Sequence, residues 1–396
     1  MLNPTQRLAR DFARLYECKG KEATTRVLGE ALKKKEILPH EFSFKALAEE
    51  CVENGREWVA GMDPRSEGGL QEASASVDTA AFSNITGQIV YSAIMDAYDQ
   101  VPNTISAAIP TMPTRLSGEK IPGISLLADN AEIVDEGEAY PTYGLSEDYI
   151  ETPQTVKRGF IVPVTKEAIF FDRTNLVLQR ASDVGTSMRT NKEKRAIDCM
   201  IDSATGIVNR TLLDHRHKWK GTSYETFKSS GEWVNIKTSN TLTDWTDIDN
   251  DNQLWANMTD PYTGEPIQIN ARTLMVCPEL EMTARSILTA TMLQLGNAAS
   301  TAPVMFGPNL VSGYSLLVSA QLKARLGADS QATTHWYIGD LAKALVYMEN
   351  WPITLSQQGA GSEDEFNRDI VVKFKASERG AYYVKNPRYI IKNTVA

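Results

Sequence analysis

The chain has 396 residues, of which 42% are apolar and 23% are charged, so it is long enough for two or three domains with a sizeable core. Its formal net charge of −9 argues against a protein that coats nucleic acid through clustered Lys and Arg. No apolar run of about 18 residues occurs, and the N-terminus lacks the apolar segment of a signal peptide. We therefore expect neither a membrane span nor secretion.

The four cysteines, Cys18, Cys51, Cys199 and Cys277, are far apart and form no CxxC pair. This spacing indicates neither a disulfide framework nor a zinc site, and it is typical of a chain kept reduced in the cytosol.

The first 60 or so residues have the apolar spacing of helices. Leu8, Phe12 and Leu15 recur at i, i+4 and i+7, and Pro39 separates this stripe from a second one that ends near Cys51. Residues 61–76 are rich in Gly, Ser and acidic side chains and predict a linker. Residues 81–98 predict a buried helix.

The segment 131–171 is rich in strand and turn residues and leads into a long helix. Its strand-like runs, 146–156 and 159–164, flank what we interpret as a basic corner at Lys157 and Arg158, and together they predict a projecting β-ribbon. An isolated two-stranded ribbon is only marginally stable in water. We therefore expect a neighbouring subunit to cover it.

Residues 174–203 contain no Pro and predict a helix that is long for a globular protein, with an apolar stripe through Val177, Ala181, Val184 and Met188. Short strands are predicted at 273–277, 314–319, 336–339, 345–348, 370–374 and 381–384, and a helix is expected to begin at Pro278. Strands and helices interleave without a βαβ period, which favours the α+β class.

No pattern of catalytic or metal-binding residues is convincing. Asp247, Asp249 and Asp251 have the alternate spacing of an EF-hand loop, but the Gly and Glu that such a loop needs are missing, so we interpret them as a solvated acidic loop. His215 and His217 lack a third ligand at metal-site spacing and are interpreted as structural or exposed. We predict no catalytic residue, no metal and no cofactor.

Four stretches in order resemble the major capsid proteins of tailed bacteriophages with the HK97-type fold. EGEAYP and VTKEAIF resemble the extended loop and the start of the spine helix, RTLMVCPELEMTARSIL resembles the axial domain, and DIVVKFKASERGAYYVKNPRYIIKNT resembles the closing strands. The resemblance covers roughly residues 81–394. It implies an α+β fold with an N-terminal helical arm, an extended β-ribbon loop, a peripheral domain with a long spine helix, and an axial domain.

The resemblance also implies six segments. They are an N-terminal helical arm and linker (1–76), a helix and connection (77–116), the extended loop (117–162), the peripheral domain with the spine helix (163–215), the axial domain (216–346), and the return strands of the peripheral domain (347–396).

By the same resemblance, the chain is expected to be a non-enzymatic capsid protein that assembles into pentamers and hexamers of an icosahedral shell around double-stranded DNA, in a virion built in the host cytoplasm. Its partners would be copies of itself, together with scaffolding, portal and decoration proteins, and no membrane. The expected intersubunit residues of the extended loop are Glu136, Gly137, Tyr140, Pro141, Lys157 and Arg158. Lys120 and Lys157 are candidates for a covalent cross-link between subunits.

Two alternatives remain open on sequence alone. An encapsulin-type compartment shell has a similar fold, although its N-terminal extension is shorter than residues 1–76. A soluble hydrolase or carbohydrate-binding domain would use the tryptophan-rich region between residues 212 and 270.

Overall fold

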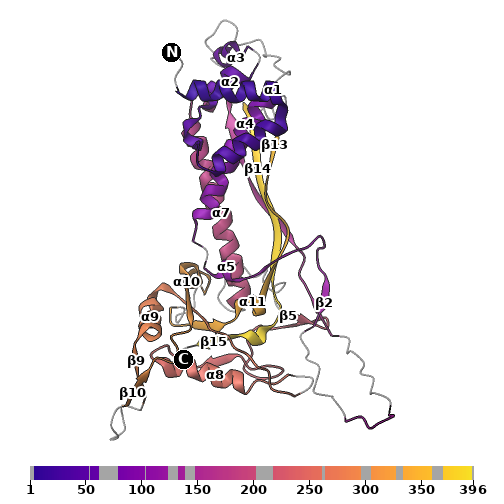
Figure 1. Cartoon of the computed structure of the whole chain (residues 1–396), viewed down its shortest axis with the longest axis vertical. Helices are drawn as coiled ribbons and strands as arrows, with labels where there is room; N and C mark the ends of the chain where they lie inside the picture. Colours follow the sequence, from indigo (N-terminus) through magenta and orange to yellow (C-terminus); the bar gives the residue numbers. More distant parts are fainter. Residues whose placement is uncertain are drawn as a thin grey trace. The chain divides into compact units, whose positions relative to one another are not determined.

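A computed structural model describes residues 4–52, 54–61, 79–102, 104–123, 133–138, 148–201, 217–260, 264–295, 305–326, 333–358 and 369–394. The chain divides into two compact units (Figure 1). Unit 1 comprises Met1–Pro102, Lys157–Asn191 and Trp351–Arg379, and unit 2 comprises Asn103–Val156, Lys192–Asn350 and Gly380–Ala396. The long helix and the two longest strands contribute residues to both units.

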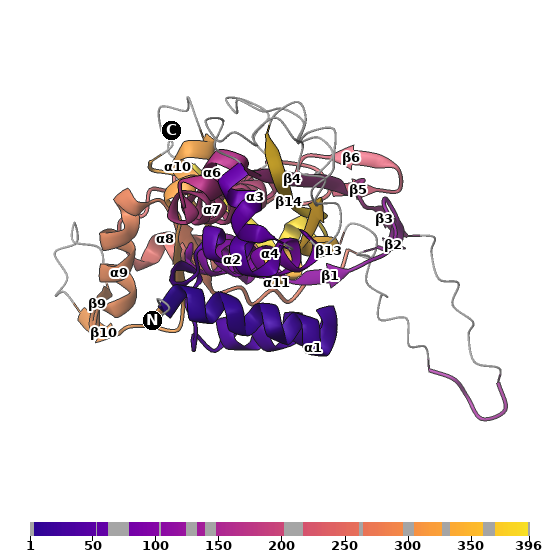
Figure 2. The same cartoon turned by 90° about the horizontal axis from the view of Figure 1, so that it is seen from above.

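Unit 1 begins with a group of helices packed on a shared apolar core. They are α1 (Pro4–Lys33), the 3-10 turn η1 (Pro39–Glu41), α2 (Phe44–Cys51), α3 (Gly55–Gly61) and α4 (Thr79–Gln100). Helix α1 is kinked at Gly20, whose φ of 77° lies in the left-handed region that glycine tolerates. Phe12, Leu28 and Phe82 are buried where α1 and α4 pack together, and Figure 2 shows the two helices side by side.

The strands of unit 1 are β4 (Val156–Thr165) and the portions of β13 (Leu345–Gln358) and β14 (Ile370–Val384) that belong to it. They are ordered β13-β14-β4, so β4 is an edge strand. Helix α6 (Lys166–Phe170) follows, and Thr165 caps it by accepting a hydrogen bond from Ala168 N. Helix α7 (Thr174–Ile201) comes next, and its residues up to Asn191 lie in unit 1.

A glycine lets α7 approach α4 closely. A Cβ at Gly185 would lie 2.2 Å from the Ile94 carbonyl oxygen, which is backbone and cannot rotate away. The single glycine of this helix therefore marks the point where the two backbones meet.

Unit 2 is built on a five-stranded mixed sheet in the order β11-β8-β12-β15-β7. Its strands are β7 (Ile236–Thr238), β8 (Thr273–Val276), β11 (Ser315–Val318), β12 (Trp336–Gly339) and β15 (Ile390–Thr394). All four residues of β12 are buried, because the strand is central and covered on both faces. Leu274, Trp336 and Ile338 anchor one of its cores.

Helices and smaller sheets complete unit 2. The remaining helical elements are α5 (Ile105–Ala108), α8 (Trp245–Ala256), η3 (Pro278–Leu280), α9 (Glu281–Thr289), α10 (Ala320–Leu326), α11 (Leu341–Ala344) and η4 (Pro387–Tyr389). The remaining strands are β1 (Thr111–Pro113), which pairs with β13, the hairpin β9 (Met292–Leu295) and β10 (Met305–Pro308), and a sheet of β2 (Lys120–Pro122), β3 (Tyr149–Glu151), β5 (His217–Trp219) and β6 (Thr222–Tyr224).

The predicted α+β class is confirmed, and the elements follow the order that the HK97-type resemblance implied. The long helix predicted at 174–203 is α7, and the helix expected from Pro278 begins as η3 and continues as α9. The strands predicted at 370–374 and 381–384 are parts of one continuous strand, β14. The six predicted segments remain a prediction beside the two compact units.

Two local predictions were wrong. Lys157 and Arg158 do not form a corner, because they lie inside β4, and the strand β3 that precedes them pairs instead with β2. The acidic run at Asp247 is a helix and not a solvated loop. It begins with a capping box in which Asp244 and Asp247 satisfy the first backbone N–H groups of α8, and Asp251 is fully buried.

Candidate assembly interface

The extended loop is joined to unit 2 at a narrow base, which we call the neck and define as β2, β3, Gly123 and Asp148. Strand β2 pairs with β3 in antiparallel register, with Ile121 opposite Ile150. Beyond this pair, the backbone N–H of Gly123 donates a hydrogen bond to the Asp148 carbonyl at 3.0 Å. The neck therefore brings together the two ends of the segment 124–147, which lies outside the described residues.

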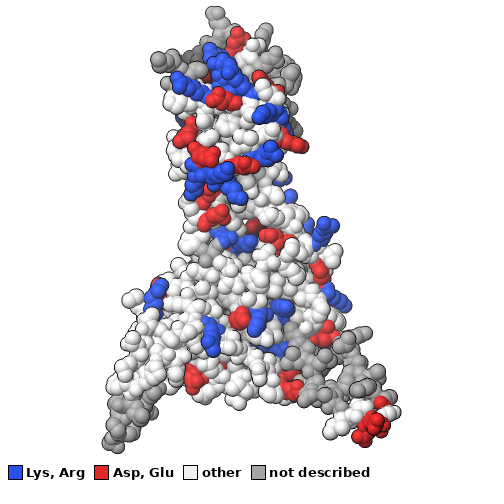
Figure 3. Space-filling view, viewed as in Figure 1, with Lys and Arg blue, Asp and Glu red and all other residues white. Residues whose placement is uncertain are grey.

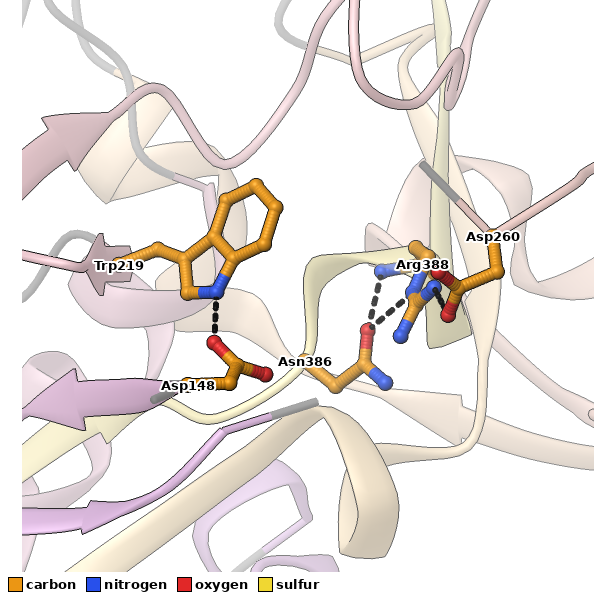
Figure 4. Close-up of polar contacts among 5 residues, drawn as sticks. All are labelled: Asp148, Trp219, Asp260, Asn386 and Arg388. Atoms are coloured by element: carbon orange, nitrogen blue, oxygen red, sulfur yellow. Dashed lines mark hydrogen bonds and ion pairs between the residues drawn. The ribbon is translucent and has the colours of Figure 1, made fainter. Parts of the chain in front are cut away.

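A tryptophan from the adjacent strand holds the neck. The indole N–H of Trp219, in β5, donates to the Asp148 carboxylate, as Figure 4 shows. A Cβ at Gly123 would lie 2.0 Å from Cγ of the same carboxylate, so only glycine leaves room for Asp148 in this position. Ile150 lies opposite Trp219 in the ladder and is fully buried. These contacts hold Asp148 and β3 against β5.

Lys120 closes the outer side of the neck. Its Nζ lies 4.2 Å from the centre of the Tyr149 ring and 4.0 Å from Glu151 Oε1. Both contacts are exposed and individually weak, each contributing at most about 1 kcal/mol. Lys120 is therefore in contact with its own chain at the base of the loop.

Buried polar groups join β5, in the sheet that contains the neck, to β14, and others hold the turn η4. Nδ1 of His217 donates to the Val384 carbonyl at 3.2 Å, and burial lowers the pKa of His217 to about 4, so the ring is neutral at physiological pH. Arg388 forms a buried ion pair with Asp260 at 3.2 Å, and its Nε donates to Asn386 Oδ1 (Figure 4). Buried hydrogen bonds of this kind favour one arrangement of the strands, although Nε2 of His217 has no hydrogen-bond partner among the described residues.

The loop that leaves the neck is acidic. No Lys, Arg or His occurs between Lys120 and Lys157, whereas eight Asp and Glu residues do. The described part, residues 133–138, contains a turn closed by a hydrogen bond from Glu138 N to Asp135 O, with Gly137 at φ 94°. Ile133 in this part is 95% exposed, and Figure 3 shows the acidic side chains as a red patch.

The structure places the predicted interface residues in different settings. Glu136 and Gly137 lie in the exposed turn of the loop, whereas Lys157 is exposed and Arg158 is half-buried in β4 of unit 1. Tyr140 and Pro141 lie outside the described residues. The intersubunit role of this set and cross-linking through Lys120 or Lys157 stay predictions.

Sequence reasoning missed two glycines. Gly123 is described above, and Gly159 lies in β4 where a Cβ would be 2.3 Å from the Ala376 carbonyl oxygen of β14. Phe160 and Ile161 follow it and are 47% and 57% exposed on the edge strand. The residues beside Gly159, Arg158 and Phe160, give no local signal of this role, because close backbone approach depends on a partner strand far along the chain.

Three of the four tryptophan side chains between residues 212 and 270 are buried, which leaves them unable to stack on a sugar, whereas Trp245 is half-buried. Trp219, Trp233 and Trp255 are each at most 7% exposed, and the latter two donate their indole N–H groups to backbone carbonyls of Thr226 and Arg388. Among the described residues, no three His, Cys, Asp or Glu side chains are grouped to hold a metal ion. No helix in the described ranges is long and apolar enough to cross a membrane. His215 lies outside these ranges.

A comparison with protein-family models identifies the family of the chain. A model of the phage capsid protein family matches residues 149–393, from β3 to β15. The chain therefore belongs to the phage capsid protein family, and its place is in the capsid shell. No relative among curated proteins matches its sequence at a significant level.

A search of solved structures finds distant matches, among them two phage structures and a virus-like particle. The chain is 14% identical to a chain of Mycobacterium phage Bobi, covering 75% of this chain and 93% of that one with a TM-score of 0.45. It is 13% identical to a chain of Gordonia phage Cozz, covering 74% of this chain and 87% of that one with a TM-score of 0.45. It is also 13% identical to a chain of a virus-like particle from Pyrococcus furiosus, covering 76% of this chain and 96% of that one with a TM-score of 0.40.

Proposed function

We propose that this capsid protein is the major head subunit of a tailed phage. Its copies form pentamers and hexamers of an icosahedral shell that encloses double-stranded DNA and is assembled in the host cytoplasm. The observation that carries the proposal is the family match over residues 149–393. The net charge of −9 suits a shell that encloses DNA without adhering tightly to it. Scaffolding, portal and decoration proteins are its expected further partners.

In this proposal the extended loop is an arm that lies on a neighbouring subunit. Three features support it: the loop is held at the neck by Trp219 and Asp148, it is acidic throughout, and its described turn exposes Ile133. A segment of one charge sign repels itself and gains order when it meets the opposite sign. The arm's acceptor is therefore a basic surface of another copy, and Glu136, Gly137, Tyr140 and Pro141 are its proposed contact residues.

The base of the arm continues into β4, where Lys157 and Arg158 are the first basic side chains after the acidic run. We assign them to contacts with carboxylates of an adjacent subunit. The edge position of β4 leaves one side of the strand without a neighbour in unit 1, which suits such a contact.

Electron microscopy of the purified protein tests the proposal. Closed shells that protect DNA from nuclease are the result expected of a phage head protein. Shells that contain a cargo enzyme and no DNA would favour the encapsulin alternative. A protein that stays monomeric at every concentration would contradict both shell functions.

A further inference from the structure

The N-terminal helices share one core with the rest of unit 1. We call the described residues between 4 and 61, which include α1, η1, α2 and α3, the N-terminal strap. One apolar cluster contains buried side chains of the strap together with side chains of α4, α7, β13 and β14. The strap contributes Ala9, Phe12, Leu28, Leu32, Phe42, Phe44, Ala46, Leu47, Ala48, Val52, Trp58 and Val59. The strap and the remainder of unit 1 therefore fold around the same core.

Helix α4 needs the strap on one of its sides. Residues 81–87 of α4 are all buried, so about two turns of this helix have no exposed side. One side meets the strands, since a Cβ at Gly87 would lie 3.4 Å from the Phe374 ring of β14. Another side meets α1, where Leu28 and Ile85 lie together and are each at most 1% exposed. Removal of the strap would expose this apolar side to water.

The side chain of Asn84 in α4 joins the strap to a strand. Its Nδ2 donates to Tyr16 Oη of α1 at 3.1 Å, and its Oδ1 accepts from Gln357 Nε2 of β13. Asn84 is 9% exposed. Withdrawal of α1 would take away the acceptor of a buried amide group, which is unfavourable.

The start of α2 is joined to the start of α7. The backbone N–H of Phe44 donates to Thr174 Oγ1 at 2.8 Å, and Ser43 Oγ donates to Asp172 Oδ1 at 2.8 Å. Thr174 Oγ1 donates to the same carboxylate oxygen at 2.8 Å. Phe44 and Thr174 are buried, so these hydrogen bonds hold the beginning of the long helix against the strap.

We propose that the N-terminal strap is a permanent part of the subunit, and that it is retained in the finished shell without a proteolytic step that removes it. The strap completes the core around α4 and holds the start of α7, whereas a removable segment would have to leave without uncovering a core. It lies outside residues 149–393, which the phage capsid family model matches. Retention in a shell rests on the proposed function, but the attachment of the strap can be tested on the subunit alone.

A cleavable chain tests the attachment. The recognition sequence of a site-specific protease is inserted between Arg65 and Ser66, in the segment 62–78 that lies outside the described residues. After complete cleavage, the two fragments should elute together from a size-exclusion column and separate only in denaturant. A strap that elutes alone, while the remainder keeps the solubility and circular dichroism of the uncut protein, would overturn the proposal.

Two neighbouring residues of α1 provide a matched pair of variants in the cleaved chain. Leu28→Ala should weaken the binding of the strap at least about tenfold, because it removes buried contacts with α4. Val27 is 42% exposed, so Val27→Ala should change the binding less than about twofold. Fluorescence anisotropy of a labelled strap in a dilution series measures both. Equal binding in the two variants would contradict the packing of the strap on α4.

The native thiols provide a second readout that needs no cleavage. Cys18 is exposed, whereas Cys51 packs against the core of unit 1 and burial raises its pKa to about 12. In the unassembled wild-type subunit, a maleimide should label Cys51 at least about tenfold more slowly than Cys18. Equal rates would mean that the strap opens freely, and the proposal would fall.

Mass spectrometry of subunits from DNA-filled particles tests retention. The strap should be present in every subunit, and a chain that begins beyond Gly61 would overturn the proposal. A wild-type chain that never forms particles would instead overturn the proposed function, and the cleaved chain would still decide whether the strap is permanent.

Discussion

Single glycines set the distances between backbones in this protein, and Gly159 gives the sharpest test. A Cβ at this position would lie 2.3 Å from the Ala376 carbonyl oxygen and 3.0 Å from Ser377 Cα, so strands β4 and β14 would have to separate. Gly159→Ala should lower the free energy of unfolding by about 1–3 kcal/mol, as other forced overpacking does. Urea denaturation of the unassembled subunit measures this change.

Gly61→Ala is the control in the same unit. No heavy atom lies within 4 Å of a Cβ at this position, and the residue ends helix α3. Its free energy of unfolding should stay within about 0.5 kcal/mol of the wild-type value. Equal effects of the two substitutions would show that β4 and β14 do not approach as closely as described.

Asp251 makes stability depend on pH. The side chain is fully buried in α8, Asn393 donates to its Oδ2 at 2.7 Å, and burial raises its pKa to about 8. The folded state therefore keeps a proton that the unfolded state releases near pH 4, so stability falls as pH rises from about 4 to 8. Asp251→Asn should remove this dependence and be more stable, relative to wild type, at pH 8 than at pH 5 by at least about 1 kcal/mol.

Thermal or urea unfolding of both proteins at a series of pH values provides the measurement. Asp249→Asn is the control, because Asp249 lies on the same helix and the pH dependence should persist in that variant. Parallel stability curves for wild type and Asp251→Asn would contradict the assignment of a buried, protonated carboxyl group.

At the scale of elements, the neck should separate folding from assembly. A variant in which residues 126–146 are replaced by a short Gly-Ser linker keeps Gly123, Asp148 and Trp219, and with them the hydrogen bonds that anchor β2 and β3. Its circular dichroism melt should match that of wild type, because the described core does not include the loop. Its sedimentation profile should show no shells.

Two results would contradict this account of the loop. Normal shells from the shortened chain would remove the basis for an intersubunit arm. A melting temperature far below that of wild type would mean that the loop serves the fold of its own subunit. Trp219→Phe, which loses the indole N–H that Asp148 accepts together with part of the buried ring, should assemble to an extent between those of the wild type and the shortened chain, because the neck would be less firmly held.

The basic pair at the start of β4 should contribute through charge. Lys157→Glu with Arg158→Glu should weaken assembly most at low salt, and the deficit should shrink as salt rises, because screening removes the contribution of these charges in the wild type. Light scattering at about 0.05 M and 0.5 M NaCl measures the extent of assembly of the variant and of the wild type. A deficit that is independent of salt would show that these residues act through packing.

Elements with a strong local signal could be predicted from the sequence. The apolar stripe through Val177 and Met188 predicted α7, and the resemblance anticipated the order of sheet and return strands. The paired strands at the neck could not be predicted, because β2 and β3 are three residues each and depend on β5 far along the chain. The run at Asp247 was misread because its alternate carboxylates suggested a loop, whereas the Asp244 capping box begins a helix.

At the scale of the whole molecule, the proposed shell function accounts for several features that the single subunit leaves exposed. The neck fixes an acidic loop, an edge strand exposes Phe160 and Ile161, and hairpin β9–β10 exposes Met292 and Phe306. Each would be a liability in a lone subunit. The proposed shell would bring neighbouring copies to such surfaces, which agrees with membership of the phage capsid protein family.

Cryo-electron microscopy of particles assembled from the wild-type chain tests this account most directly. The account predicts a closed shell in which the loop beyond Gly123 and Asp148 lies on a neighbouring copy. A shell in which this loop faces solvent, or a preparation that contains only monomers at the highest attainable concentration, would contradict it.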